Sequence, residues 1–270
     1  MNLFYTDDSA LDPNKHTFFV YGGVEIPGEN ALWLHDAIER LRTKHGLKPD
    51  QALKYNPTPE GMTKESFNNL KAGIISAASK AGCKFYTTVV LHEITKKDIQ
   101  KTRRWAIERM LFGFNSNLRT SKKHGIVLID RFTDKEMDRH ILSLFSVGNK
   151  NLPYSKESRH ERILGIHYSS IGQSHFCSLV DIVLGSFRLT VDLSDRKGKA
   201  APETPTKLAK IIHPLFVTCG SKGAIAEISI TFNPKVIKHS GYRAKYNELK
   251  DYLKSIGLET AQQITGERQY

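Results

Sequence analysis

The sequence predicts an α/β protein in which helices cover both faces of a mixed β-sheet, followed by a small α+β extension at the C-terminal end. Three observations support this class. Two short apolar runs near the N-terminus are joined only by a turn, which is typical of a hairpin. Beyond them, apolar runs alternate with amphipathic segments of helical period, and the composition changes after Asp192.

The predicted strands are rich in aromatic and β-branched residues, and turn residues such as Asp12, Pro13 and Asn14 separate the first two. The run at residues 125–130 is nearly all aliphatic, which is typical of a strand buried on both faces. Strands are predicted at residues 3–6, 17–26, 51–55, 84–91, 125–130 and 162–168. These segments supply the mixed sheet.

The predicted helices repeat apolar residues every three or four positions. In the first of them Leu32, Ile38 and Leu41 are apolar, with charged residues between them. Helices are predicted at residues 28–46, 64–81, 95–120, 134–146 and 174–192. A polar loop is expected between the fourth and fifth helices, through Pro153 and Arg159.

The chain is expected to have two parts, a core at residues 1–192 and a C-terminal extension at residues 193–270. Residues 194–207 are charged and contain Pro and Gly, which is typical of a linker or mobile loop. A helix at residues 205–212, a strand at 224–232 and a helix at 242–256 are predicted in the extension. Its role stays open between a dimerisation element, a substrate clamp and a site for a protein partner.

The net charge indicates which kinds of partner the protein favours. Forty Lys and Arg residues against 28 Asp and Glu residues give +12, and a field of that sign favours polyanions, nucleic acid first and anionic membrane second. A basic enzyme kept soluble by its charge is the alternative.

The isolated cysteines Cys83, Cys177 and Cys219 argue against a disulfide framework or a cysteine zinc site. With no signal peptide and no apolar run of about 20 residues, we expect a cytoplasmic protein that does not use a membrane.

Common catalytic motifs are missing from the sequence. The pairs His92-Glu93 and His160-Glu161 lack the second His of an H-E-x-x-H zinc site. The phosphate-binding G-x-x-x-x-G-K-[ST], the dinucleotide-binding G-x-G-x-x-G and the hydrolase G-x-S-x-G patterns do not occur either. The sequence therefore does not favour a protein driven by nucleotide hydrolysis, a dinucleotide-dependent oxidoreductase or an α/β-hydrolase.

Two acidic residues follow predicted strands, where sheet proteins commonly bind ligands. Asp7 follows the first strand and Asp130 ends the aliphatic run at residues 125–130. Each has a simpler interpretation as a helix cap or turn residue, since Asp is favoured in both places.

Asp181 is harder to explain structurally, because the helix that carries it is largely apolar. A buried carboxylate costs several kcal/mol unless it is paired or binds a metal. An ion pair with Arg188, two turns later, is one explanation. The other is a metal ligand beside Ser178 and Gly185, which are small enough to let a backbone approach.

Carboxylates that converge from separate strands and a helix can hold two divalent cations, which activate water and stabilise the leaving oxygen in phosphodiester cleavage. Oxygen ligands without clusters of Cys or His suit Mg²⁺ or Mn²⁺. We therefore expect Asp7, Asp130 and Asp181 to form such a site.

The sequence resembles domain-of-unknown-function family 3800, whose members look like RNase H-like nucleases. The resemblance covers about residues 1–192 and is carried by Tyr5-Thr6-Asp7-Asp8-Ser9, residues 18–26, Leu53-Lys54, residues 127–131 and residues 178–185. It implies an RNase H-like fold and an acidic cluster of Asp7, Asp130 and Asp181 that binds Mg²⁺ or Mn²⁺, with Asp8 adjacent and Lys54 nearby. Families of this kind suggest a role in mobile elements or phage defence.

This sequence departs from the family's usual pattern at two places. The usual Asp-Glu-Ser-Gly start is Asp7-Asp8-Ser9-Ala10 here, and the Gln often found before the last Asp is Ser178. A shorter second acid weakens a ligand role for Asp8.

Further side chains are candidates for accessory roles. Lys54 is expected to contact a phosphate or stabilise charge at the leaving group, with an ordinary exposed lysine as the alternative. His160, His167 and His175 are candidates for proton transfer. His175 is the best placed of them, although a hydrogen bond at the start of its helix explains it as well.

Basic residues are concentrated between Lys96 and Lys123. On a helix, Lys97, Lys101 and Arg104 would share one face and track a phosphate backbone, with binding that weakens as salt rises. Trp105 and Phe112 are expected on another face, directed inward. A solvated charged face is the simpler interpretation, and residues 155–162 form a second, partly basic loop.

These observations favour a divalent-metal-dependent nuclease that hydrolyses phosphodiester bonds of DNA or RNA by a two-metal carboxylate mechanism. The predicted catalytic residues are Asp7, Asp130, Asp181 and Lys54, with Asp8, Ser178 and His175 as accessory residues. The predicted nucleic-acid-binding residues are Lys97, Lys101, Arg104 and Arg188. Two alternatives stay open: a non-catalytic nucleic-acid-binding or partner-regulated module with the same fold, and a metal-dependent hydrolase of a small phosphorylated molecule.

Overall fold

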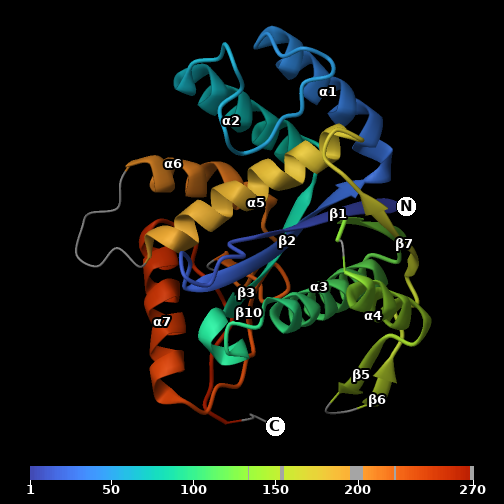
Figure 1. Ribbon diagram of the computed structural model, residues 1–270, viewed down its shortest axis with the longest axis vertical. Coiled ribbons are helices and arrows are strands. Elements are labelled where there is room, and N and C mark those ends of the chain that lie inside the picture. Colours follow the sequence, from blue (N-terminus) through green and yellow to red (C-terminus); the bar gives the residue numbers. More distant parts are fainter. Residues whose placement is uncertain (133, 153–154, 195–202, 222, 268–270) are drawn as a thin grey trace.

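A computed structural model describes residues 1–132, 134–152, 155–194, 203–221 and 223–267. Its centre is a six-stranded sheet in the order β10-β3-β2-β1-β4-β7 (Figure 1). The strands of this sheet are β1 (Asn2–Ser9), β2 (Phe18–Pro27), β3 (Lys84–Leu91), β4 (Gly125–Asp130), β7 (Ile163–Ser169) and β10 (Ile230–Asn233). Strand β2 is antiparallel to both its neighbours, whereas β1, β4 and β7 are parallel, as are β3 and β10. The predicted mixed sheet is confirmed.

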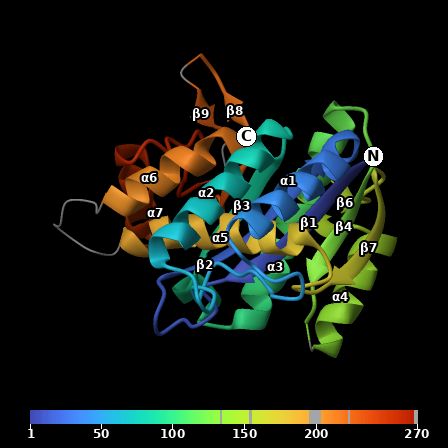
Figure 2. The same ribbon diagram turned by 90° about the horizontal axis from the view of Figure 1, so that it is seen from above.

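Helices cover both faces of the sheet (Figures 1 and 2). One face packs against α1 (Ala31–Lys44), α2 (Lys64–Lys80), α5 (His175–Leu193), α6 (Glu203–Ile212) and α7 (Ser240–Ser255). The opposite face packs against α3 (Ile99–Thr120) and α4 (Lys135–Ser146). The predicted α/β class is therefore confirmed, including the coverage of both faces.

The alternation of side chains along β1 divides the core into two clusters. Phe4 faces the α3 side, where its ring stacks on Phe114 with centroids 4.4 Å apart. Tyr5 faces the α5 side and meets Phe176 edge-on at 5.5 Å. The same alternation directs Asp7 toward α5 and Asp8 toward α3, because successive side chains of a strand point to opposite faces.

The segment from Leu193 onward is continuous with this core. Strand β10 adds to the edge of the sheet beside β3, and apolar side chains of α6 and α7 belong to the same cluster as those of α5. Residues 195–202, most of the predicted linker, lie outside the described residues.

Three element predictions are wrong. Residues 51–55 form no strand, although buried Leu53 and Tyr55 flank exposed Lys54 with the alternation of one. Helix α3 begins at Ile99 because a 3-10 helix (His92–Thr95) and the left-handed residues Lys96 and Lys97 precede it. The predicted strand at residues 224–232 is interrupted between β9 (Ala224–Ile225) and β10.

Other elements were not anticipated. A hairpin of β5 (Asn149–Leu152) and β6 (Ser155–Ser158) replaces most of the predicted polar loop, whose Pro153 lies outside the described residues. Strand β8 (Thr218–Cys219) pairs with β9. Two further 3-10 helices are Gly28–Asn30 and His213–Leu215.

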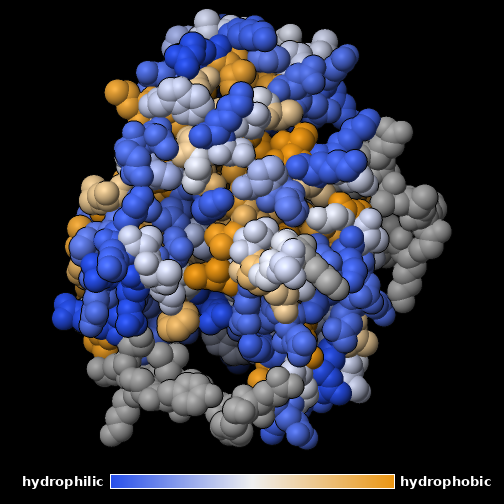
Figure 3. Space-filling view, turned by 180° about the vertical axis from the view of Figure 1, so that it is seen from behind, coloured by the Kyte–Doolittle hydropathy of each residue, from blue (hydrophilic) through white to orange (hydrophobic). Residues whose placement is uncertain are grey.

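Hydrophilic residues cover much of the face seen from behind, with apolar residues gathered near its centre (Figure 3). Among the described helices, none has the length and apolar content that crossing a membrane requires.

Tyr246 of α7 ties the C-terminal helix to the sheet. Its hydroxyl accepts from the Leu91 N–H and donates to the Asn233 carbonyl, both at 2.8 Å, and the side chain is fully buried. We expect Tyr246→Phe to lower the free energy of unfolding by about 1–3 kcal/mol, because the buried Leu91 N–H loses its acceptor. Urea unfolding measures this change. Tyr242→Phe, on the same helix, should shift stability by no more than about 0.5 kcal/mol, and equal losses in both variants would contradict the prediction.

Candidate functional site

A small cavity of about 80 Å³ lies where the sheet meets α5, at the carboxyl ends of β1, β4 and β7. The residues around it are Thr6, Asp7, Lys54, Asp130, Ser169, Ile171, Cys177, Val180 and Asp181. The structure therefore brings together the four residues that were predicted to be catalytic. We call this cavity the acidic pocket.

The parallel pairing of β1 with β4 puts two of the acids side by side. Thr6 pairs with Ile129, so Asp7 and Asp130 are the next residues along neighbouring strands. Asp130 is the last residue of β4, as predicted. Asp7 does not end its strand, because β1 continues to Ser9.

Asp181 approaches the acidic pocket from α5, and a backbone amide holds its carboxylate. The Tyr55 N–H donates to Asp181 Oδ2. Tyr55 comes this close because its ring lies on Gly185, where an added Cβ would be 2.3 Å from Tyr55 Cγ. The expectation that a small residue lets a backbone approach Asp181 is confirmed. The alternative explanation, an ion pair between Asp181 and Arg188, is not what the structure shows, since Arg188 pairs with Asp192 at 2.8 Å.

Lys54 reaches the acidic pocket from an extended segment that is anchored on both sides. Leu53 and Tyr55 are buried, while Lys54 between them is exposed. Upstream, Arg42 Nη2 donates to the Gln51 carbonyl at 2.7 Å. The anchored backbone leaves the Lys54 side chain facing the carboxylates.

Electrostatics within the acidic pocket are unfavourable. Burial raises the pKa of Asp7 to about 8, and repulsion from Asp8, Asp130 and Asp181 adds to this. Burial also raises the pKa of Asp130 and Asp181, which the Lys54 charge partly opposes. Buried carboxyl groups that repel one another are characteristic of functional sites.

Asp8 lies on the other face of the sheet from Asp7. Its carboxylate pairs with Arg103 of α3, with Nε and Oδ2 2.5 Å apart, and the guanidinium lies 4.7 Å from the centre of the Phe132 ring. Asp8 is therefore not brought into the acidic pocket as an accessory ligand. Its charge still raises the pKa of Asp7.

The other predicted accessory residues lie outside the acidic pocket. Ser178 is buried in α5 and does not line it. His175 pairs with Glu39 of α1, with Nε2 and Oε2 2.7 Å apart. His160 is buried elsewhere, and burial lowers its pKa to about 4, while His167 is exposed on β7. None of the three histidines is near enough to line the pocket.

Two further residues line the acidic pocket and were missed. Ser169 pairs with Asp130 at the end of the neighbouring parallel strand, and it could have been found from its place at a strand end. Thr6 also borders the pocket, but its side chain points to the α3 side, where it shares a hydrogen bond of 2.8 Å with the Tyr21 hydroxyl.

The chemistry of the acidic pocket is that of hard oxygen donors. Three carboxylates and the Ser169 hydroxyl are among the groups that line it, and such groups suit Mg²⁺ or Mn²⁺. Across the described parts of the chain, no group of three or more His, Cys, Asp or Glu side chains is arranged to hold a metal ion.

Comparison with known proteins gives no relative from which a function could be carried over. The chain matches no family model, no curated protein and no solved structure.

The predicted basic stripe is divided in the structure. Lys97 precedes α3 and donates to Asn14 Oδ1 at 3.3 Å, so it does not share a helical face with Lys101 and Arg104. Arg188, also predicted to bind nucleic acid, is engaged with Asp192. Lys101 and Arg104 remain together on the first turns of α3.

Proposed function

We propose that this protein is an RNase H-like, divalent-metal-dependent nuclease that hydrolyses phosphodiester bonds of nucleic acid. One observation carries the proposal: three carboxylates and a lysine from separate segments surround the acidic pocket. Packing Asp7, Asp130 and Asp181 together opposes folding, because each loses hydration and repels the others. A function that needs concentrated negative charge explains why the chain has this arrangement.

The sheet supports the RNase H-like part of the proposal. In the order β3-β2-β1-β4-β7, β2 is antiparallel to its neighbours and β1, β4 and β7 are parallel, which is consistent with the RNase H-like fold that the sequence resemblance implies. Strand β10 is an addition at the β3 edge. Because one fold supports many functions, the acidic pocket and not the sheet is the basis for the activity.

Asp7, Asp130 and Asp181 would hold Mg²⁺ or Mn²⁺. Such a cation supplies activation of water and stabilisation of the leaving oxygen when it is bound. The Tyr55 N–H keeps the Asp181 carboxylate oriented. Lys54, exposed at the rim, is placed to bind a phosphate oxygen of the substrate. The three carboxylates would have to approach one another on binding, since the structure arranges no such group as a metal site among its described residues.

Nucleic acid is favoured over a small phosphorylated substrate by charge. The net charge of +12 greatly exceeds what a small ligand needs, and Lys101 and Arg104 on α3 supply cations for a phosphate backbone.

The proposed compartment is the cytoplasm. Cys83, Cys177 and Cys219 are all free thiols, which suits a reducing compartment of this kind.

The test is calorimetric titration with Mn²⁺ and Mg²⁺ at low salt, followed by cleavage assays on DNA and RNA. We expect wild-type protein to bind Mn²⁺, and Asp181→Asn to lose this binding because the substitution keeps the shape but removes the charge. Cleavage should fall by roughly 100- to 1,000-fold, as expected for loss of one electrostatic group at a reacting centre.

Asp192→Asn is the matched control. Asp192 lies on the same helix but pairs with Arg188 and His16 away from the acidic pocket, so metal binding and cleavage should be unchanged. Equal cleavage by wild type and Asp181→Asn would disprove the proposal. Nucleic-acid binding without metal binding or cleavage would instead establish the non-catalytic module.

A further inference from the structure

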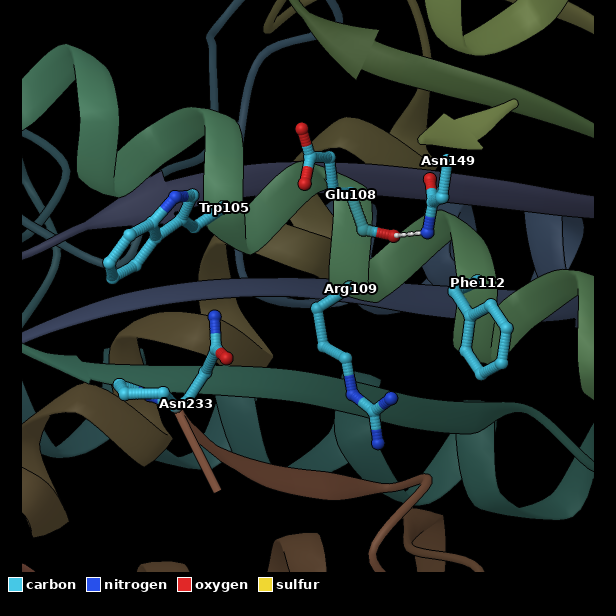
Figure 4. Close-up of a pocket in the computed structure, with 7 residues that line it drawn as sticks. Trp105, Glu108, Arg109, Phe112, Asn149 and Asn233 are labelled. Carbon is cyan, nitrogen blue, oxygen red and sulfur yellow. Dashed lines mark hydrogen bonds between the residues drawn. The ribbon is translucent and has the colours of Figure 1, made fainter. Parts of the chain in front are cut away.

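A second, larger cavity of about 280 Å³ lies on the α3 side of the sheet. Helix α3 contributes Trp105, Glu108, Arg109 and Phe112, and Asn149 of β5 and Asn233 of β10 close it from other directions (Figure 4). We call it the aromatic pocket. It shares no lining residue with the acidic pocket.

The two aromatic rings of this pocket were expected to face the core, which is wrong. Trp105 and Phe112 are only partly buried and project from α3 at opposite ends of the aromatic pocket (Figure 4). Seven residues of helix separate them by about 10 Å. Each has a cation at its face: Lys101 Nζ lies 5.2 Å from the Trp105 ring centre, and the Arg109 guanidinium 5.5 Å from that of Phe112.

Ion pairs hold the Arg109 side chain in place. Its guanidinium pairs with Glu227 at 3.1 Å, and Glu227 also pairs with Lys235 at 3.0 Å. The ion pairs of Arg109, Glu227 and Lys235 therefore hold the Arg109 guanidinium in position between the two rings. Aromatic faces beside cations are the combination that single-stranded nucleic acids bind, through stacked bases and paired phosphates.

Asn149 borders this pocket with a side chain that is only 7% exposed. Its Nδ2 donates to the Glu108 carbonyl at 3.4 Å. Its Oδ1 is buried, so the Asn149 side chain forms one edge of the pocket and offers no acceptor to a ligand. The Glu108 carboxylate and the Asn233 carboxamide lie around the same opening (Figure 4).

We infer that the aromatic pocket binds an unpaired nucleobase of a single-stranded nucleic acid. The flat base stacks on Trp105 or Phe112, and the Asn233 carboxamide hydrogen-bonds its polar edge. The cavity is near the small end of ligand pockets, roughly 300–1,000 Å³, which suits one base.

This inference rests on the proposed function only in taking the partner to be nucleic acid. It does not require cleavage, so binding can be measured in EDTA. Fluorescence anisotropy with labelled oligodeoxyadenylate, alone and annealed to oligothymidylate of equal length, tests it. Wild-type protein should prefer the single strand, because the bases of a duplex are paired and stacked and cannot stack on Trp105 or Phe112.

Trp105→Leu and Trp33→Leu form a matched pair, since Trp33 is a partly exposed tryptophan between α1 and α2. Trp105→Leu should weaken oligodeoxyadenylate binding by roughly 5- to 150-fold, and Trp33→Leu should not change it.

The Trp33→Leu protein also gives a measurement that leaves the aromatic pocket intact. Trp105 is then the sole tryptophan, since the sequence has two, and its fluorescence should be quenched when oligodeoxyadenylate binds. Absence of quenching, equal binding of the single strand and the duplex by wild type, or unchanged binding by Trp105→Leu would each overturn the inference. The metal titration of the acidic pocket is unaffected by any of these results.

Discussion

Asp7→Asn is expected to be more stable than wild type at pH 8 in EDTA, by up to about 5 kcal/mol. The pKa of Asp7 is about 8 in the folded protein, against an ordinary value of 3.8. A raised pKa makes the carboxyl group most favourable to folding below pH 3.8, and this contribution is lost as pH rises to 8. When the folded and unfolded pKa values differ by one, the free energy of unfolding changes by about 1.36 kcal/mol. Asparagine carries no charge at any of these pH values, so only wild type should lose stability in this way.

Urea unfolding at pH 4, 6 and 8 measures the difference between the two proteins. The curves should coincide near pH 4 and separate as pH rises. Asp50→Asn is the control, because Asp50 is exposed. A constant difference between Asp7→Asn and wild type across this pH range would contradict the prediction. Added Mn²⁺ should stabilise wild type at pH 8, by about 2.7 kcal/mol at 100 times the dissociation constant, and Asp7→Asn much less.

Gly185→Ala is expected to lower both the stability of the protein and its affinity for Mn²⁺, although Gly185 does not line the acidic pocket. An added Cβ at residue 185 would lie 2.3 Å from Tyr55 Cγ and 2.7 Å from Tyr55 Cβ, so the segment that carries Lys54 must move. Overpacking of this kind costs roughly 1–3 kcal/mol. Asp181 would also lose the Tyr55 N–H, so Mn²⁺ affinity should fall by about 10- to 100-fold, as for a lost supporting hydrogen bond.

Gly113→Ala is the matched control for this substitution. Gly113 also lies within a helix, and a Cβ there would meet its nearest neighbour at 3.6 Å, an ordinary contact. Alanine should be neutral or stabilise the helix by up to about 1 kcal/mol. Unfolding free energies and calorimetric Mn²⁺ affinities check both variants. Wild-type stability and affinity in Gly185→Ala would refute the role assigned to the Gly185–Tyr55 contact.

The acidic residues could be recognised from the sequence because each conflicts with its surroundings. Asp130 follows an aliphatic run, and Asp181 interrupts an apolar helix. A charge in such a place costs free energy, so it is visible without knowledge of its neighbours. Asp8 was also open to prediction, since adjacent residues of a strand face opposite sides, and the Asp8–Arg103 pair follows that rule.

Other features depend on partners that local patterns do not specify. Leu53 and Tyr55 alternate in burial like strand residues, yet Tyr55 packs on α5 without a neighbouring strand. Trp105 and Phe112 have the spacing of core residues, but the end of β10 and the start of β5 leave them around a cavity. In both cases the apolar character was evident and the surface it contacts was not.

Hydrophobic period and desolvation cost are local properties, so the sequence is enough to predict most of the helices and strands and to recognise the acids that are out of place. The tertiary structure was needed to show that Tyr55 packs on Gly185, that Trp105 and Phe112 border a cavity, and that β10 extends the sheet. Periodicity indicates which face of an element is apolar. Which other element covers that face is set by packing between segments that are distant in the chain.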